Sequence, residues 1–192
     1  MNESSRNYVQ QYELGTAFTD VLPIAGGVNV SGSLGYLFWT EYLRPMLFFE
    51  DLEVGDTFKF GSYTITKAEM IDFAERYDPQ PFHLDEATAA ESMFGELIAS
   101  GWHTASICVR LVSKDVFDNI ESMGGRGVDD LRWHRPVKPD DVISGTITVV
   151  DRRPSRSHPG RGYVDFETTA VNQRGERILS MINLGMIRRR SE

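Results

Sequence analysis

Beyond residue 46 the chain shows helical and strand periodicities in turn. From Thr57 to Ile65, aromatic and β-branched residues predict a strand. Thr66 is a good N-cap residue and Glu69 stands three positions later, so a capping box is expected to open a helix. Apolar residues then recur at helical spacing as far as Pro79, which disfavours helical backbone at the residue before it. The pattern therefore predicts a strand, then a helix that ends before Pro79.

The second half of the chain changes from one long helix to strands. A short helix is expected to start at Asp85 and to break at Gly95. From Trp102 to about Phe117, apolar residues fall on nearly all faces, which is typical of a buried helix. After Gly124-Gly125 the period becomes two, and strands are predicted over Gly127–His134, Val142–Arg152, Gly162–Val171 and Arg177–Arg188. This order predicts an α+β fold in which a curled antiparallel sheet wraps one long helix.

Residues 1–46 follow neither period for long. They contain several glycines and a late aromatic run over residues 36–39, but no Gly-Lys-Ser/Thr that would make a phosphate-binding loop. We therefore expect an N-terminal extension of unclear order over residues 1–46, followed by one domain over residues 47–190.

Composition excludes several classes of protein. The formal net charge of −8 argues against general nucleic-acid binding. The sequence contains no stretch of eighteen apolar residues, so no membrane-spanning helix is predicted. The polar start, Met1 to Gln10, does not resemble a secretory signal. The single cysteine, Cys108, rules out an intramolecular disulfide and favours a reducing compartment. A cytoplasmic protein without a membrane segment is the expectation.

The charge is unevenly distributed. Residues 1–100 carry 5 Lys/Arg and 16 Asp/Glu, whereas residues 101–192 carry 15 and 12, and most of these cations are arginines after Arg132. Two interpretations remain open, a solvated surface of mixed charge and a local site for a phosphorylated ligand.

Asp78 and His83 form an acid–histidine pair in a stiff local context. Two prolines lie between them, so we expect a rigid, non-helical hexapeptide that fixes their relative placement. Such a pair could share the proton transfers that add a water to a double bond. The alternative is a proline-rich turn in which Asp78 only caps the next segment.

Ser100-Gly101 opens the long helix. The unpaired N–H groups at a helix start lie at the positive end of the dipole, and Gly101 has no Cβ to keep a ligand away. They could stabilise a thioester oxygen that gains negative charge. The alternative is a glycine required only for close packing.

The remaining candidates are weaker. We interpret His103 and Cys108 as packed residues of the helix, His134 as a strand residue and His158 as part of a loop. The four histidines show no metal-ligand spacing, so no metal site is expected.

Three blocks of sequence resemble the MaoC-like dehydratases, or (R)-specific enoyl-CoA hydratases. Tyr77-Asp78-Pro79-Gln80-Pro81-Phe82-His83-Leu84-Asp85 resembles the family's hydratase motif. Leu97 to Thr104 resembles its second block, and Arg132 to Val142 its third. The three blocks occur in the family's order, and the resemblance covers about residues 47–190.

This resemblance implies a hot-dog fold, with five or six antiparallel strands around one long helix. It implies reversible hydration of trans-2-enoyl thioesters to (R)-3-hydroxyacyl thioesters, with Asp78 and His83 as catalytic residues. It also implies that the N–H of Gly101 binds the thioester oxygen, with Ser100, Gln80 and Trp102 beside the substrate. Which of Asp78 and His83 is the base stays open.

The resemblance also implies partners. The acyl group would arrive as a thioester of CoA or acyl carrier protein, no further cofactor is expected, and the chain has length for one hot dog, so a homodimer is expected. Arg132, Arg135 and Arg153 are candidates to bind the carrier's phosphates. Gln80 departs from the family's usual Asn. A thioesterase or a non-catalytic thioester-binding protein of the same fold is the alternative.

Overall fold

The computed structural model describes residues 46–190, so the predicted extension lies outside the described residues apart from Met46. The elements are η1 (Phe49–Asp51), β1 (Thr57–Thr64), α2 (Lys67–Tyr77), α3 (Pro81–Leu84), α4 (Glu86–Glu91), α5 (Gly101–Asp115), η2 (Phe117–Asn119), β2 (Ser122–Trp133), β3 (Val142–Pro154), β4 (Arg161–Val171) and β5 (Arg177–Arg188). The α+β class that the sequence predicts is confirmed.

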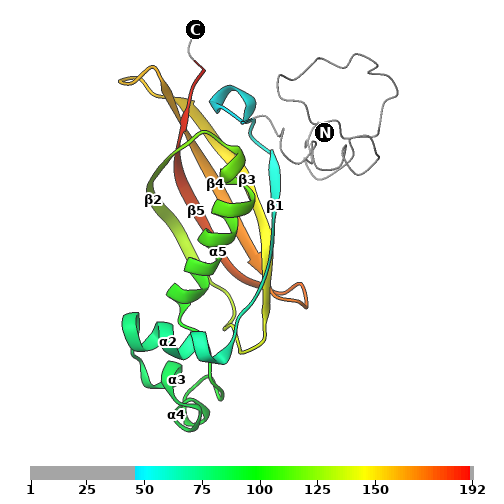
Figure 1. Ribbon diagram of the computed structural model, residues 1–192, viewed down its shortest axis with the longest axis vertical. Coiled ribbons are helices and arrows are strands. Elements are labelled where there is room, and N and C mark those ends of the chain that lie inside the picture. Colours follow the sequence, from blue (N-terminus) through cyan, green and yellow to red (C-terminus); the bar gives the residue numbers. More distant parts are fainter. Residues whose placement is uncertain (1–45, 191–192) are drawn as a thin grey trace, which may run out of the picture.

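The five strands form one antiparallel sheet in the order β1-β3-β4-β5-β2. β4 and β5 are joined through the predicted turn, in which Gly175 has a φ of +75° and is therefore in the left-handed region that favours glycine. The sheet curls around α5, which lies across its inner face, while α2, α3 and α4 gather at one end of the molecule (Figure 1). This end is where the N-terminus of α5 meets the residues that follow α2.

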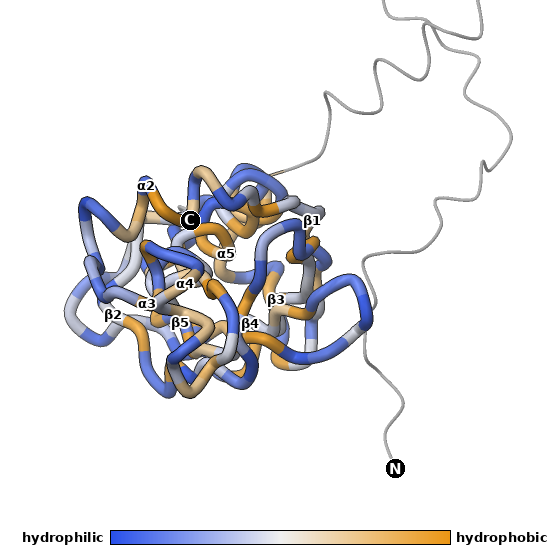
Figure 2. The backbone as a smooth tube through the Cα atoms, turned by 90° about the horizontal axis from the view of Figure 1, so that it is seen from below, coloured by the Kyte–Doolittle hydropathy of each residue, from blue (hydrophilic) through white to orange (hydrophobic). Residues whose placement is uncertain are grey.

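The core lies between α5 and the inner face of the sheet. Alternate residues of β4 are buried, in the period of two that places every second side chain on one face. They meet α5 side chains such as Cys108 and Leu111, and the apolar colouring of the tube is concentrated there (Figure 2). Burial of this apolar surface fixes the helix on the sheet.

The N-cap of α2 is the predicted residue, but the predicted capping box is only half formed, because the Glu69 carboxylate accepts from the Thr66 hydroxyl and not from its backbone N–H. Thr66 is the N-cap, and its Oγ1 accepts a hydrogen bond from the N–H of Glu69 at 3.3 Å. The helix ends at Tyr77, before Pro79, as the sequence predicts.

Two boundaries differ from the prediction. Pro81–Leu84 is a short helix rather than non-helical backbone, because a proline at the first helical position has the right φ and needs no N–H partner. β2 starts at Ser122, five residues before the predicted Gly127. Gly124 and Gly127 take positive φ values, and the register against β5 is irregular here, so backbone pairing continues through this glycine-rich stretch.

The long helix is less buried than its apolar pattern predicts. Its sheet-facing side chains are buried, but Trp102 is 57% and Val109 47% exposed. In the single chain the sheet covers only one side of α5. The prediction that α5 is buried on most faces is therefore wrong for the side that carries Trp102 and Val109.

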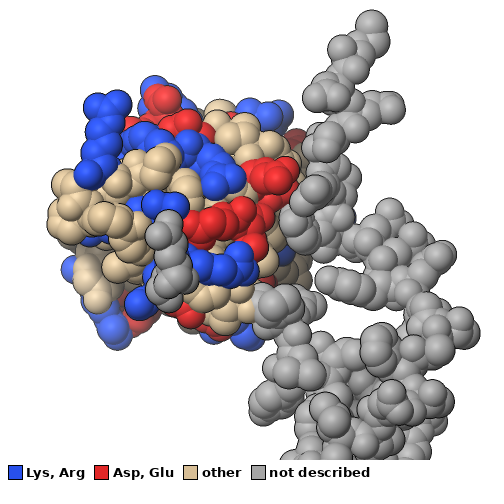
Figure 3. Space-filling model, turned by 90° about the horizontal axis from the view of Figure 1, so that it is seen from above, with Lys and Arg blue, Asp and Glu red and all other residues tan. Residues whose placement is uncertain are grey.

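Many arginines of the second half of the chain pair with acidic residues. At the end of the molecule far from α3 and α4, Arg188, Arg189 and Arg190 form ion pairs with Glu121, Glu50 and Asp51. Blue and red side chains lie next to one another on this end (Figure 3). At this end of the molecule, arginines from the end of the chain are thus paired with acidic residues from distant segments. Within residues 46–190, no helix has the length and hydrophobicity needed to cross a membrane.

Candidate active site

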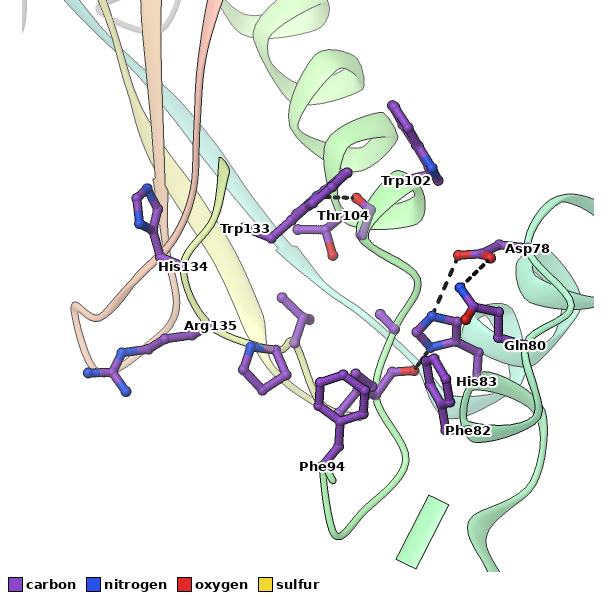
Figure 4. Close-up of a pocket in the computed structure, with 15 residues that line it drawn as sticks. Asp78, Gln80, Phe82, His83, Phe94, Trp102, Thr104, Trp133, His134 and Arg135 are labelled. Atoms are coloured by element: carbon purple, nitrogen blue, oxygen red, sulfur yellow. Dashed lines mark hydrogen bonds and ion pairs between the residues drawn. The ribbon is translucent and has the colours of Figure 1, made fainter. Parts of the chain in front are cut away.

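A cleft of about 460 Å³ lies where the start of α5 faces the α2–α4 segment and the loop that follows β2. Its lining residues are Asp78, Gln80, Phe82, His83, Phe94, Ile98, Ala99, Gly101, Trp102, Thr104, Trp133, His134, Arg135, Pro136 and Val137. The cleft thus collects residues from all three blocks of sequence (Figure 4). Most of its walls are apolar, with a few convergent polar groups, as in typical small-molecule sites.

Asp78 is the C-cap of α2 and receives hydrogen bonds on both carboxylate oxygens. Ser100 Oγ donates to its Oδ2 at 2.7 Å, and Gln80 Nε2 donates to its Oδ1 at 3.0 Å. The bond from Ser100 is the largest cause that holds the pKa of Asp78 below its ordinary value; the Gln80 amide and the nearby His83 act in the same direction, and partial burial opposes them. Asp78 is therefore ionised at neutral pH.

His83 is buried on α3 with one ring nitrogen facing Asp78. Its Nδ1 lies 2.9 Å from the carbonyl oxygen of Ile98. Because a carbonyl only accepts, Nδ1 must carry the proton and donate. The other nitrogen, Nε2, lies 3.5 Å from Asp78 Oδ2 (Figure 4). The backbone of Ile98 thus orients the ring, and Nε2 is the nitrogen that can exchange a proton in the cleft.

Ser100 and Gly101 join the acid–histidine pair to the long helix. Ser100 is fully buried and is the N-cap of α5, with its Oγ accepting from the N–H of Trp102 at 3.2 Å. Gly101 is the first helical residue, and its N–H has no acceptor within residues 46–190. The structure therefore brings Asp78, His83, Gln80, Ser100, Gly101 and Trp102 together, as the sequence predicts.

Trp133 is a cleft residue that sequence reasoning missed. Its Nε1–H donates to the carbonyl oxygen of Gly101 at 2.8 Å, and its indole lies edge-on to Trp102. A Cβ on Gly101 would lie 2.6 Å from the indole, so the glycine is needed for this close approach. The signal available in the sequence was a tryptophan near the end of a predicted strand, inside the proline-containing third block.

The three candidate arginines do not lie together. Arg135 lines the cleft and faces Glu176 at a loose 3.9 Å. Arg132 pairs with Asp130 outside the cleft. Arg153 pairs with Asp151 near the far end of β3. Arg153 is not among the residues that line the cleft of its own chain.

The weaker candidates divide into packed and exposed residues. Cys108 is fully buried, and burial raises the pKa of its thiol to about 12, which confirms that it is a packed thiol. His103 is also buried, whereas His134 lines the cleft and approaches Ser180. Within residues 46–190 no group of three histidine, cysteine or carboxylate side chains is arranged to hold a metal ion.

Residues 50–171 match the family described as MaoC like domain. The chain belongs to this family. The resemblance of the three sequence blocks is thereby confirmed. The layout is a hot-dog fold, and the protein Rv0216 from Mycobacterium tuberculosis, described as a double hot-dog fold, matches 77% of this chain at 16% identity with a TM-score of 0.63.

Closer relatives share more of the sequence. A MaoC-like dehydratase from Rhodospirillum rubrum is 40% identical, covers 76% of this chain and 99% of its own, and has a TM-score of 0.70. The uncharacterized protein YdeM of Bacillus subtilis is 31% identical over 58% of this chain and 79% of its own length. A 3-hydroxybutyryl-CoA dehydratase of Methylorubrum extorquens is 33% identical over 58% and 69%. The family thus includes proteins named as acyl-CoA dehydratases and hydratases.

Proposed function

We propose that this protein adds water reversibly to trans-2-enoyl thioesters and forms (R)-3-hydroxyacyl thioesters. The observation that carries the proposal is the pair Asp78 Oδ2 and His83 Nε2, 3.5 Å apart in a cleft that also holds the first N–H groups of α5. The names of relatives as a dehydratase and as hydratases support this class of reaction.

The environment of Asp78 favours it as the base in the hydration direction. Its lowered pKa keeps the carboxylate ionised, so it can take a proton from water but has none to give. The hydroxide oxygen then bonds to C3 of the enoyl group, and a protonated His83 gives its Nε2 proton to C2. The proton on Asp78 afterwards returns to His83 across the gap between them, which restores the starting state.

Negative charge develops on the thioester oxygen as C3 accepts the oxygen nucleophile. The N–H of Gly101, unpaired and at the positive end of α5, is the group proposed to bind that oxygen. Trp102 and Trp133 line the cleft next to Gly101, where they give it an apolar wall.

In this proposal the acyl group is carried by CoA or by acyl carrier protein, and no further cofactor takes part. Arg135 is the arginine that lines the cleft. It is exposed, and within residues 46–190 its one ion pair is loose, so we assign it to the carrier's anionic groups. Arg132 and Arg153 are both paired and lie outside the cleft, which leaves them less suited to this role.

The proposal includes a homodimer built through β2. This strand is at one edge of the sheet, and its side chains are exposed along almost its whole length. Exposed apolar residues of β2 and α5 lie on this side: Met123, Val128, Trp133, Trp102 and Val109. An open edge beside an apolar surface favours pairing with a second copy.

The direct test is the loss of the conjugated enoyl absorbance when the protein is added to crotonyl-CoA. Asp78→Asn and His83→Ala should each keep the fold and lose roughly 10²–10⁴-fold in kcat. The double variant should be little worse than the worse single variant, because the two groups act as a unit. Asp72→Asn and His158→Ala, the same residue types at exposed positions outside the cleft, serve as matched controls.

A thiol reagent in the same assay distinguishes the alternatives. Release of free CoA with no hydroxyacyl product would make the protein a thioesterase. Binding of the thioester without either change would make it a non-catalytic thioester-binding protein. Near-wild-type turnover in either single variant would remove the assignment of that residue.

A further inference from the structure

A polar pair outside the cleft, the buried His103 and the partly buried Glu69, takes no part in the proposed chemistry. His103 is 8% exposed on the first turn of α5, and Glu69 is on α2. His103 Nε2 lies 4.0 Å from Glu69 Oε1, too far for a hydrogen bond. The atoms Glu69 Oε1 and His103 Nδ1 are both buried and have no hydrogen-bond partner within residues 46–190. Buried polar groups are costly, so this pair calls for a role.

The His103 ring also contacts an aromatic side chain of α2. It stacks on Phe73, with ring centroids 4.5 Å apart and planes only 6° from parallel. The Glu69 carboxylate is held in place from the other side, since Tyr63 Oη donates to its Oε2 at 3.0 Å and Thr66 Oγ1 at 3.1 Å. His103 thus sits between a fixed carboxylate and a flat ring that both belong to α2.

The position of this contact matters because α2 and α5 carry the two halves of the site. Asp78 is the C-cap of α2, and its bonding partner Ser100 is the N-cap of α5. Phe73 is five residues before Asp78, about 7.5 Å along a helix, and His103 is three residues after Ser100. Met70 and Ala74 are buried on the adjoining face of α2. The histidine contact therefore adds a second line of contact beside them, and this line opposes rotation of α2.

We propose that His103 is a positioning residue, which holds α2 against α5 so that Ser100 stays in hydrogen-bond contact with Asp78. The inference deepens the proposed hydration and rests on it for its kinetic part. Its structural part, the dependence of the Ser100–Asp78 bond on the His103–Phe73 stack, stands independently of any substrate.

The first measurement reads the Asp78 carboxylate without any substrate. Because Ser100 lowers the pKa of Asp78, loosening of α2 should move that pKa up towards its ordinary 3.8. The carboxyl ¹³C signal is followed against pH and assigned with Asp78→Asn. His103→Ala should show the upward movement. His103→Phe, which keeps a flat ring for Phe73, and the exposed control His158→Ala should not.

The second measurement is kinetic. His103→Ala should lower kcat on crotonyl-CoA by roughly ten- to a hundredfold, because small displacements of positioned groups have effects of this size, while KM stays nearly constant. His103→Phe should restore most of kcat. Phe73→Leu removes the stack from the other helix and should resemble His103→Ala, and the double variant should be no worse than either. Phe73→Leu therefore tests the same stacking contact even if His103→Ala does not fold.

The results separate the two proposals. If His103→Ala and Phe73→Leu fold and leave both kcat and the Asp78 titration as in the wild type, the positioning role is overturned. It is also overturned if His103→Phe is as impaired as His103→Ala. If the wild type hydrates no enoyl thioester but the Asp78 titration responds as described, the proposed function fails and the coupling between the helices stands.

Discussion

Ser100 is the residue on which most of the site depends, since one hydroxyl group caps α5 and also donates to Asp78. Ser100→Ala should reduce the free energy of unfolding by about 1 kcal/mol through loss of the cap. It should also raise the pKa of Asp78, so the acid side of the kcat/KM–pH profile moves to higher pH. Chemical denaturation and the pH profile measure the two effects. Ser106→Ala, exposed on the same helix, is the control, and an unchanged profile in Ser100→Ala would contradict this role.

Gly101 has two roles, and variants of Gly101 separate them only when a second residue is also changed. Its missing Cβ makes room for Trp133, whereas its N–H is the proposed oxyanion donor. Gly101→Ala alone would displace the indole and so is not a clean control for Gly101→Pro. Gly101→Pro and Gly101→Ala should therefore be compared in a Trp133→Ala background, where the indole no longer occupies the space beside residue 101.

In that background, Gly101→Pro should have a kcat roughly 10²–10³-fold below that of Gly101→Ala, because one oxyanion donor is lost. The proline itself should fit: Ser100 has a ψ of 137°, the extended backbone that a residue before proline prefers, and proline is favoured at the first helical position. Steady-state kinetics with circular dichroism as the folding check decide the matter. Equal kcat values in the two variants would assign the oxyanion contact to another group.

At the scale of elements, the packing of α2 on α5 should make stability depend on pH. Burial lowers the pKa of His103 in the folded protein, and Glu69 opposes this shift; Tyr63 on β1 holds Glu69, and Arg110 of α5 lies over the Tyr63 ring. The unfolded chain, with a histidine pKa of about 6.5, binds the proton more readily. This contribution to stability is therefore complete above that pH and is lost as the pH falls below it.

The expected result is that the free energy of unfolding decreases between pH 7 and pH 5 more steeply in the wild type than in His103→Phe. Urea denaturation at several pH values gives the two slopes, and their difference removes the other titrating groups. His158→Ala should keep the wild-type slope. A His103→Phe slope equal to that of the wild type would show that His103 does not change its proton affinity on folding.

At the scale of the whole molecule, the exposed side of α5 and the open edge of β2 are expected to meet a second copy. Val128, half exposed in the middle of β2, is the residue to change. Val128→Lys should shift the protein from dimer towards monomer, because a two-fold interface through β2 would bury the added charge twice, once in each copy. Sedimentation velocity measures the shift. Val54→Lys, exposed in a turn away from β2, is the control, and a monomeric wild type would contradict the dimer.

The local features of this protein could be predicted from its sequence because neighbouring residues determine them. The N-cap at Thr66, the end of α2 before Pro79 and the whole of β5 follow from side-chain hydrogen bonding, proline geometry and a period of two. The spacing of Asp78 and His83 and the Ser-Gly start of α5 likewise indicated candidates that lie together in the cleft. Their chemical roles remain proposals.

The contacts between distant segments were decided only by the tertiary structure. Ser100 reaches Asp78 across 22 residues, Trp133 reaches Gly101 across 32, and Ile98 orients the ring of His83. The glycines of β2 pair with β5 although their local preference is for a loop. The arginines after residue 132 spread over both ends of the sheet, because an extended strand carries successive residues far apart. Local sequence patterns determine the backbone conformation of each element, whereas the packing of α2, α5 and β2 determines which side chains contact one another.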